Sequence, residues 1–353
     1  MKRKVLFLGE TYRADAITWM NGLREFGDFD ITTWALQTPS NSLKNKVLRI
    51  LEFMFCVLKI RKIIVNEKPA IVIAERATSY GFLAALSGAK IVIVAQQGIS
   101  DLWPKNSILY PFKKMMQDYA FKKATLVHAW GTVMIPAMQE GKVSESKIMI
   151  LPKGIDLEQF TPINNATFDK ITAIVTRSLL LEYGHETILK AFAIVKSKNM
   201  AFQLTIVGDG KMRTYLEKTV AALGLKKEVD FTGKINNSAL PKMLQQHLFY
   251  ISMPTTEGVS ASLFEAMACK CFPIVSDIAG NQAFIKNNDN GKLIPTSNPE
   301  KLADAIIVSF KNHDMIQNAV NRNFEFVFEH ANYKTNMSLI AKKYHDLIVK
   351  NNN

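Results

Sequence analysis

Short apolar runs alternate with longer helical patterns along the first half of the chain. The runs lie at 5–8, 31–36, 70–74, 90–95, 125–129 and 148–151, and several are continuously apolar rather than alternating. Continuous runs are typical of strands that are buried on both faces of a parallel sheet. Helical patterns lie between them at 15–26, 43–66, 78–87, 107–123 and 131–140. This order predicts a doubly wound α/β domain, whose ligand crevice lies at the carboxyl ends of the strands.

The same alternation restarts after a break at 152–168 that contains prolines, a glycine and paired asparagines. Strands are expected at 171–176, 202–207, 229–231, 248–252 and 272–275, with helices at 185–198, 211–223, 238–246 and 260–269 and from 299 onward. The prediction is an α/β protein with two Rossmann-like doubly wound domains that face each other across a cleft. The domains are expected at 1–165 and 166–325, and a C-terminal helix at 326–353 is expected to pack back towards the first domain.

Composition narrows the class of protein. The 353 residues are 48% hydrophobic and 21% charged, which suits two folded domains and excludes a disordered chain. The three cysteines, Cys56, Cys269 and Cys271, form an odd number without metal-binding spacing and indicate a reducing compartment. The apolar run at 5–8 is too short for a signal peptide, so a cytoplasmic protein is expected.

The net charge of +13 suggests an anionic partner without naming it. Basic residues concentrate at 43–65 and 105–123, and neither stretch reaches the roughly 20 apolar residues of a membrane span. Residues 43–65 form either a domain helix with snorkelling Lys and Arg side chains or a basic amphipathic helix on anionic lipid headgroups. The second basic stretch favours an anionic membrane surface.

The segment 256–268 carries the strongest candidate chemistry. It follows an apolar strand, turns at Glu257 and Gly258, and enters a helix of small residues. Such a turn directs backbone N–H groups and the positive end of a helix at an anion. Glu265 lies inside this helix, where an acid is costly unless it is paired or liganded, and its carboxylate could accept two ribose hydroxyls. The alternative is that both acids are simply exposed at a helix end.

The spacing of Glu257 and Glu265 resembles the Glu-x7-Glu motif of retaining nucleotide-sugar glycosyltransferases, the family 4 enzymes or glycosyl transferases group 1. Segments at 151–162, 207–210, 231–235 and 266–295 resemble other motifs of that family in the same order. The resemblance implies a GT-B fold and a metal-independent transfer that keeps the anomeric configuration. It implies a nucleotide-diphosphate sugar as donor, with UDP-sugars the most frequent in the family.

The resemblance also assigns roles to residues. It makes Arg177 the phosphate-binding arginine and Glu257 the residue that contacts the donor sugar, and these two are the expected catalytic residues. The expected donor-binding residues are Glu265, Tyr183, Gly208, Gly210, Ile235, Gly258, Val259, Ser260, Ala261 and Ser262. The expected acceptor-binding residues are Gln97, Gly98, Asp101 and His128. No metal or cofactor is implied, and the sole Asp-x-Asp motif, Asp28 to Asp30, is expected in a loop before an early strand.

Three positions depart from the family pattern. Tyr183 stands where the family usually has a lysine, so stabilisation of the leaving group has to rely on Arg177 and the helix dipole. Gln97 stands in the place of a histidine near the reacting sugar. At the N-terminus, Gly9 is followed by Glu10 where a Gly-Gly turn is common.

Two histidines have more than one interpretation. His128 ends an expected strand and either contacts the acceptor or is a satisfied core histidine. His185 follows the turn at Tyr183 and Gly184, and it is expected to be a cap or surface residue.

The predicted function is a glycosyltransferase that builds a bacterial surface polysaccharide on a polyprenyl-diphosphate-linked or saccharide acceptor, peripherally bound to the inner face of the cell membrane. Two alternatives stay open: a nucleotide-sugar epimerase or hydrolase of the same fold, and a non-catalytic nucleotide-sugar-binding subunit. No nucleic-acid partner is expected, because the basic residues belong to no recognised nucleic-acid module.

Overall fold

The computed structural model describes residues 2–38, 42–96, 98, 107–163 and 168–352. It divides the chain into two compact units, Met1–Lys153 with Tyr333–Asn353 (unit 1) and Gly154–Asn332 (unit 2). The sequence indicated boundaries at 165 and 325. The structure places the first boundary earlier because Ile155 and Phe160 are buried in the core of unit 2.

Unit 1 is built on a six-stranded sheet in the order β2-β1-β3-β4-β5-β6, and all neighbouring strands are parallel. All five residues of β3 are buried, as expected for a strand covered on both faces. The strands are β1 (Arg3–Leu8), β2 (Phe29–Trp34), β3 (Ile71–Glu75), β4 (Val92–Gln96), β5 (Leu126–Ala129) and β6 (Ile148–Ile150). The helices are α1 (Ala14–Gly27), α2 (Leu43–Glu67), α3 (Phe82–Leu86), α4 (Tyr110–Lys123), α5 (Ile135–Glu140) and α13 (Tyr333–Asn352).

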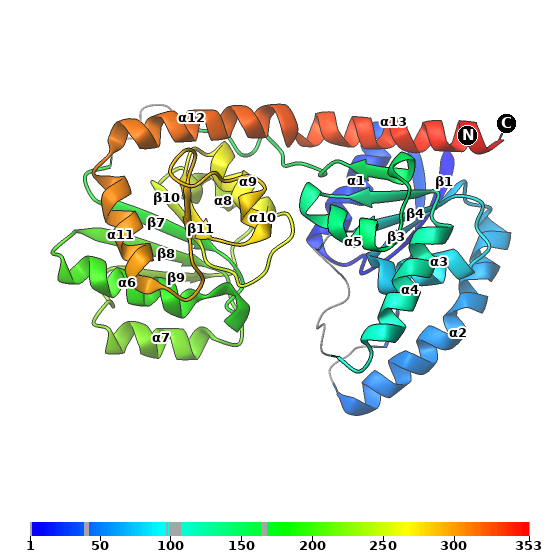
Figure 1. Ribbon diagram of the computed structural model, residues 1–353, viewed down its shortest axis with the longest axis horizontal. Coiled ribbons are helices and arrows are strands. Elements are labelled where there is room, and N and C mark those ends of the chain that lie inside the picture. Colours follow the sequence, from blue (N-terminus) through cyan, green and yellow to red (C-terminus); the bar gives the residue numbers. More distant parts are fainter. Residues whose placement is uncertain (1, 39–41, 97, 99–106, 164–167, 353) are drawn as a thin grey trace. The chain divides into compact units, whose positions relative to one another are not determined.

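Helix α13 joins unit 1 from the far end of the sequence and runs beside α1 (Figure 1). Nε2 of His345 donates to the Gly27 carbonyl at 2.7 Å, and the His345 ring stacks on Phe29. Tyr333 donates to the Thr18 carbonyl at 2.9 Å. The C-terminal helix is therefore part of the core of unit 1.

Unit 2 has a second six-stranded parallel sheet, in the order β12-β11-β10-β7-β8-β9. The strands are β7 (Ile171–Thr176), β8 (Phe202–Val207), β9 (Val229–Gly233), β10 (Phe249–Ser252), β11 (Phe272–Ser276) and β12 (Lys292–Ile294). The helices are α6 (His185–Ser197), α7 (Arg213–Ala222), α8 (Leu240–Leu244), α9 (Ala261–Ala268), α10 (Ala279–Gln282), α11 (Pro299–Phe310) and α12 (His313–His330).

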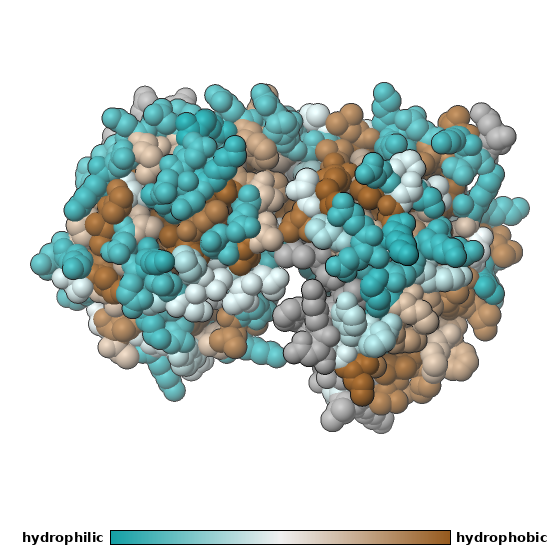
Figure 2. Space-filling model, in the orientation of Figure 1, coloured by the Kyte–Doolittle hydropathy of each residue, from teal (hydrophilic) through white to brown (hydrophobic). Residues whose placement is uncertain are grey.

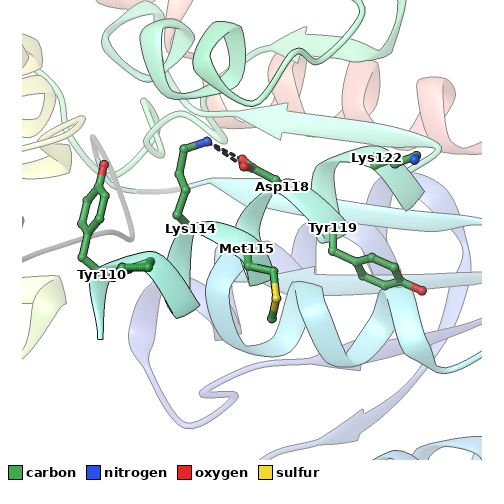
Figure 3. Close-up of a pocket in the computed structure, with 7 residues that line it drawn as sticks. Tyr110, Lys114, Met115, Asp118, Tyr119 and Lys122 are labelled. Atoms are coloured by element: carbon green, nitrogen blue, oxygen red, sulfur yellow. Dashed lines mark hydrogen bonds and ion pairs between the residues drawn. The ribbon is translucent and has the colours of Figure 1, made fainter. Parts of the chain in front are cut away.

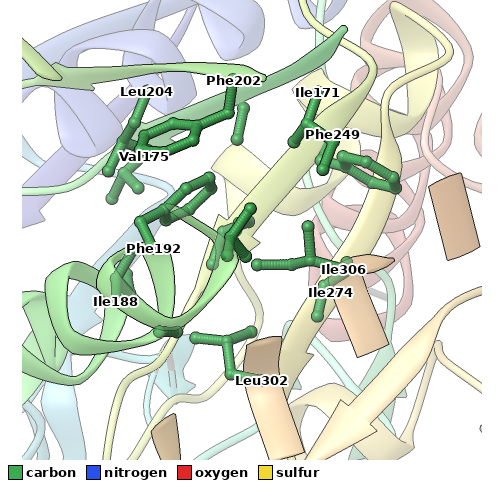
Figure 4. Packing of buried hydrophobic residues seen from close by; sticks show 14 of the residues in the cluster. Ile171, Val175, Ile188, Phe192, Phe202, Leu204, Phe249, Ile274, Leu302 and Ile306 are labelled. Carbon is green, nitrogen blue, oxygen red and sulfur yellow. The ribbon is translucent and has the colours of Figure 1, made fainter. Parts of the chain in front are cut away.

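The core of unit 2 consists of two apolar layers, one on each face of its sheet. Phe249 and Ile251 of β10 enter one layer and Tyr250 enters the other, because successive side chains of a strand point to opposite faces. The first layer packs the strands against α6, α7 and α11, as Figure 4 shows for Phe192 and Ile306. Helices α8 and α9 cover the opposite face.

The predicted α/β class with two doubly wound domains is confirmed by these two parallel sheets. Three details differ. Strand β12 and helix α10 were not expected, since three and four residues are too short to show a period. Strand β2 begins at Phe29, so Asp30 lies in the strand and not in a loop before it.

Candidate active site

The strand order of unit 2 predicts where a ligand binds. The chain leaves β7 towards β8 and β9, and it later returns to the other side of β7 to add β10 and β11. In open parallel sheets, ligands bind beyond the carboxyl ends of the two strands at which the order reverses. Arg177 follows β7 directly and Ser252 is the last residue of β10, so both lie at this switch point.

Arg177 is the centre of a compact polar cluster. Its Nε donates to the Ser252 hydroxyl at 3.2 Å, and its Nη2 donates to Glu257 and to the Ser260 hydroxyl. Burial by itself would lower the pKa of Arg177, but the neighbouring Tyr250 and Glu257 offset burial and hold the pKa above its ordinary value. The guanidinium is therefore a permanent cation in a largely water-excluded position.

The amino end of α9 adds to this positive site. Ser260 caps the helix, and its hydroxyl accepts from the Leu263 amide at 3.3 Å. The first amides of a helix have no partner within it and carry the positive end of the helix dipole. The predicted donor-binding residues Gly258, Val259, Ala261 and Ser262 all lie in this turn or in the first turn of α9. Together with Arg177, the turn offers an anion both a cation and backbone donors.

Four further predicted donor-binding residues are Gly208, Gly210, Ile235 and Glu265. A Cβ at Gly208 would lie 2.3 Å from the Arg177 carbonyl oxygen, and one at Gly210 would lie 2.4 Å from that of Leu179. These glycines allow the loop after β8 to approach the Arg177 backbone closely. Ile235 is half-buried against the second apolar layer, and Glu265 is half-buried within α9.

Sequence reasoning missed two residues of the site. Ser252 holds Arg177 Nε, and its position at a strand end was the signal that could have identified it. Gly280 lies under the loop that carries Glu257, where a Cβ would be 2.3 Å from the Glu257 carbonyl oxygen. Across the described part of the chain, no three His, Cys, Asp or Glu side chains are grouped closely enough to hold a metal ion.

His185 lies close to Arg177, and the expectation of a cap or surface residue is wrong. It is the first residue of α6, only 3% exposed, and the structure shows no side-chain cap there. Burial, together with the nearby Arg177 cation, lowers the pKa of His185 to about 4. A neutral imidazole therefore lies beside the guanidinium.

His128 has the geometry of a core histidine. It is 1% exposed, and its Nε2 donates to the Leu151 carbonyl at 2.7 Å. Because a carbonyl only accepts, Nδ1 is the acceptor for the Tyr344 hydroxyl at 2.9 Å. Burial lowers the pKa of His128 to about 4. Both ring nitrogens are engaged inside unit 1, which disfavours the predicted contact with an acceptor.

The other predicted acceptor residues are mostly untested by the structure. Gln97 and Asp101 lie outside the described residues, and Gly98 is half-buried beyond the end of β4. The sheet of unit 1 nevertheless has a switch point of its own, at β1 between β2 and β3. Residues that follow β1 and β3 are therefore also candidates for binding a ligand.

A charged cluster occupies this second switch point. Glu10 lies two residues after β1, and its Oε2 is 2.8 Å from Arg76 Nη2 and 3.4 Å from Arg13 Nη1. Its Oε1 is 3.9 Å from Nη2 of Arg49 on α2. The buried Glu75 carboxylate accepts from the Glu10 amide at 2.8 Å. Arg76 has a φ of +64°, in a region that side chains rarely adopt and that often marks functional positions.

Helix α2 has an apolar stripe on the side away from its buried residues. Val47, Leu51, Met54, Leu58 and Val65 recur at helical spacing, and all five are exposed. Figure 2 shows the hydrophobic residues gathered over α2. The helix buries Cys56 and Ile60 on its other side. A contiguous exposed apolar surface of this kind marks an interaction site.

A second group of exposed apolar side chains lies just before α4 and in its first turns. Ile108, Leu109, Phe112 and Met115 are all more than half exposed. A shallow depression of about 650 Å³ runs along α4, where Lys114 pairs with Asp118 at 2.6 Å (Figure 3). Its lining residues are Tyr110, Pro111, Lys114, Met115, Asp118, Tyr119 and Lys122. None of the helices in the described ranges is long and apolar enough to cross a membrane.

Comparison with known proteins assigns unit 2 to a family. Residues 158–325 match the family model "Glycosyl transferases group 1", and this range covers nearly all of unit 2. An uncharacterized glycosyltransferase of Methanocaldococcus jannaschii is 25% identical over 252 residues. That match covers 69% of this chain and 64% of the relative, so the chain spans less than two thirds of that protein.

Two relatives with named reactions match longer parts of their sequences. One is the Campylobacter jejuni N-acetylgalactosamine-N,N'-diacetylbacillosaminyl-diphospho-undecaprenol 4-alpha-N-acetylgalactosaminyltransferase, 26% identical over 74% of this chain and 73% of that protein. The other is the Escherichia coli UDP-Gal:alpha-D-GlcNAc-diphosphoundecaprenol alpha-1,3-galactosyltransferase, 24% identical over 74% of this chain and 71% of that protein.

Solved structures agree in fold over almost the whole length. Anabaena HepE in complex with UDP superposes with a TM-score of 0.79, at 14% identity, over 98% of this chain and 100% of that chain. Sucrose-phosphate synthase from Thermosynechococcus elongatus gives 0.80, at 16% identity, over 99% and 100%. With this shared fold, the chain has the GT-B fold, and its unit 2 matches the glycosyl transferases group 1 family.

Proposed function

We propose that this protein is a retaining, metal-independent glycosyltransferase that transfers a sugar from a UDP-sugar to a hydroxyl of a lipid-linked acceptor. We place this reaction in the synthesis of bacterial surface polysaccharide, with a polyprenyl-diphosphate-linked or saccharide acceptor. The observation that carries the proposal is the convergence of Arg177, Glu257 and Ser260 at the switch point of unit 2, at the amino end of α9. All three residues were expected from the sequence, Arg177 and Glu257 as catalytic residues and Ser260 as a donor-binding residue.

The donor diphosphate binds to Arg177 and to the amides at the start of α9. Guanidinium and amide donors are suited to phosphate oxygens, and they neutralise the departing diphosphate without a metal ion. In the structure, the Glu257 carboxylate accepts from the guanidinium that the phosphate would need. When the phosphate takes over this guanidinium, Glu257 becomes available to accept from hydroxyls of the donor sugar.

Retention of configuration follows if the acceptor attacks from the face on which the diphosphate leaves. The leaving phosphate oxygen then takes the proton of the acceptor hydroxyl, so no separate protein base is needed. Negative charge grows on that oxygen in the transition state, and preorganised donors such as Arg177 stabilise it most at that moment. This role makes Arg177 a catalytic residue as well as a binding residue.

The identity of the substrates is proposed from the relatives. HepE was solved with UDP, and the E. coli relative is named for UDP-Gal. Both named relatives act on sugars linked to undecaprenol through a diphosphate. We extend these classes to the present chain, with unit 2 binding the donor and unit 1 binding the acceptor. The charged cluster at Glu10 and Arg76 is the part of unit 1 that we assign to the acceptor.

A lipid-linked acceptor requires the enzyme to work at a membrane. The exposed apolar surface of α2 and α4 supplies the contact, since a basic amphipathic helix lies at the boundary of headgroups and acyl chains. Lys59 and Lys62 of α2 are exposed, and they lie at the edge of this surface. Their charge complements anionic lipids. We therefore propose a peripheral location on the inner face of the cell membrane.

The test is binding and turnover with the purified full chain. Calorimetry with UDP, GDP and ADP identifies the base, and UDP-sugars are then supplied with a short-chain polyprenyl-diphosphate-linked sugar. Arg177→Ala should lower kcat/KM by roughly 10²–10³-fold, the usual effect of removing one transition-state donor. Glu257→Ala should lower kcat/KM as well, because the donor sugar then loses a hydrogen-bond acceptor. Arg322→Gln is the matched control, because Arg322 pairs with Asp289 at an exposed position of unit 2. This control should behave like the wild type.

Three results would contradict the proposal. The first is that no nucleotide diphosphate binds to the wild type. The second is that Arg177→Ala and Glu257→Ala match the Arg322→Gln control. The third is conversion of the nucleotide sugar without any acceptor, which would identify an epimerase or a hydrolase instead. Proton NMR of the product reports the anomeric configuration, and chelators should leave the rate unchanged.

A further inference from the structure

The guanidinium of Arg177 lies over the ring of Tyr183. The central carbon of the guanidinium is 5.4 Å from the ring centroid, within the range of a cation–π interaction. The hydrogen bonds of Arg177 to Ser252, Glu257 and Ser260 are made by N–H groups, which lie in the plane of the guanidinium. The ring is therefore a contact of the guanidinium that is separate from its hydrogen bonds.

The backbone fixes the position of this ring. Tyr183 ends a short 3-10 turn, and Gly184 continues it with a φ of +64°. A Cβ at Gly184 would lie 2.4 Å from the Met253 carbonyl oxygen, so the turn packs tightly on the segment after β10. The Thr255 amide donates to the Glu182 carbonyl at 2.9 Å, which ties the turn to the loop that leads to Glu257.

We infer that Tyr183 is a positioning residue, whose aromatic face holds the Arg177 guanidinium in the orientation that receives the donor diphosphate. This inference rests on the proposed donor site. A planar guanidinium binds a phosphate well only when its fork faces the phosphate oxygens. The in-plane partners Glu257 and Ser260 have to be exchanged when the phosphate binds, whereas the contact with the ring persists. The ring thus keeps Arg177 oriented during the exchange.

The orientation matters because one cation carries much of the charge. Arg177 places a positive charge at the amino end of α9 through its contacts with Glu257 and Ser260. The aromatic face also excludes water from one side of the guanidinium, which strengthens its interaction with an anion. We therefore expect the ring of Tyr183, rather than its hydroxyl, to determine the affinity for the diphosphate.

Two variants of the full chain separate these roles: Tyr183→Phe and Tyr183→Leu. Phenylalanine keeps the aromatic face and leucine removes it. We expect Tyr183→Phe to bind UDP like the wild type and Tyr183→Leu to bind it roughly three- to thirty-fold more weakly, the range of one cation–π contact.

Uridine is the probe that separates positioning from a general disturbance of the site. It carries no phosphate, so its dissociation constant should stay the same in both variants. Tyr215→Leu is the matched control, since Tyr215 lies on the surface of α7 and bonds to Glu186. In turnover assays, Tyr183→Leu should raise KM for the donor and lower kcat, and Tyr183→Phe should restore both.

The results distinguish a failure of the proposed function from a failure of the inference about Tyr183. If wild-type protein does not bind UDP, the proposed function fails and not the assignment of Tyr183. If wild type binds UDP and Tyr183→Leu binds it equally well, the inference is wrong. It is also wrong if Tyr183→Phe is as weak as Tyr183→Leu, since the hydroxyl then matters. A parallel loss of uridine affinity overturns it as well.

Discussion

Neutralising two lysines of α2 should weaken binding to anionic membranes. Lys59 and Lys62 are exposed and lie near Phe55 and Leu58, which are 65% and 66% exposed. A lysine or arginine near an anionic bilayer surface contributes about 1 kcal/mol. The double variant Lys59→Gln/Lys62→Gln should therefore lose about 2 kcal/mol, or roughly 30-fold in the partition coefficient.

The apolar part of the surface can be tested separately. Phe55 and Leu58 still expose about two thirds of their area, and full burial of such side chains contributes about 1.5–3 kcal/mol each. Phe55→Ser/Leu58→Ser should thus lose roughly 2–4 kcal/mol of lipid affinity. This loss should persist at high salt, whereas the loss caused by removing the lysines should vanish there, because ions screen exposed charges.

Co-sedimentation with vesicles measures both effects. Vesicles of phosphatidylcholine alone and vesicles with added phosphatidylglycerol are compared at low and high salt. Lys226→Gln/Lys227→Gln is the matched control, since it removes the same charge from an exposed position of unit 2. An equal loss in this control would refute the reasoning, because net charge and not the α2 surface would then determine binding. Absence of wild-type binding to the anionic vesicles would refute it too.

Two further predictions concern stability and the loop that carries Glu257. The pKa values of His128 and His185, about 4 in the folded chain, lie below the ordinary 6.5, so the unfolded chain takes up their protons first as the pH falls. Between pH 7 and pH 5, the free energy of unfolding should therefore fall by about 2 kcal/mol for each histidine. Chemical denaturation at a series of pH values should show this decrease, and the decrease should be smaller in His128→Gln. Gly280→Ala should displace the Glu257 carbonyl and thereby lower kcat/KM by roughly 10²-fold. Ala279→Ser is the control and should leave kcat/KM unchanged. Wild-type kinetics in Gly280→Ala would contradict this prediction.

Apolar patterning predicted the strands because most of them are buried on both faces. Strand β3 is apolar at its first four positions and buried at all five, so a continuous run was a reliable signal. The order of the strands in the sheet could not be predicted in this way, because β10 pairs with β7 although β8 and β9 lie between them in the sequence. No local pattern shows that Ser252 and Arg177 meet, and the resemblance supplied only part of this cluster.

The two histidines show why burial was harder to predict than strand position. His128 is satisfied by Tyr344, which lies 216 residues further along the chain on α13. His185 begins a helix, a position that is usually exposed, but the turn before it packs on the segment after β10. In both cases the decisive neighbour is distant in sequence, so the surrounding residues carry no signal of burial.

Both switch points hold an arginine against a carboxylate, and this arrangement bears on ligand selection. Arg177 pairs with Glu257 in unit 2, and Arg76 pairs with Glu10 in unit 1. The Arg177 pair is mostly buried, and separating a buried pair without replacement costs several kcal/mol. A ligand that offers phosphate alone satisfies Arg177 but leaves Glu257 without a partner. Under the proposed function, a nucleotide-diphosphate sugar would satisfy both groups, the guanidinium through its phosphates and the carboxylate through its hydroxyls. The ion pair would then select for the intact donor over its separate parts.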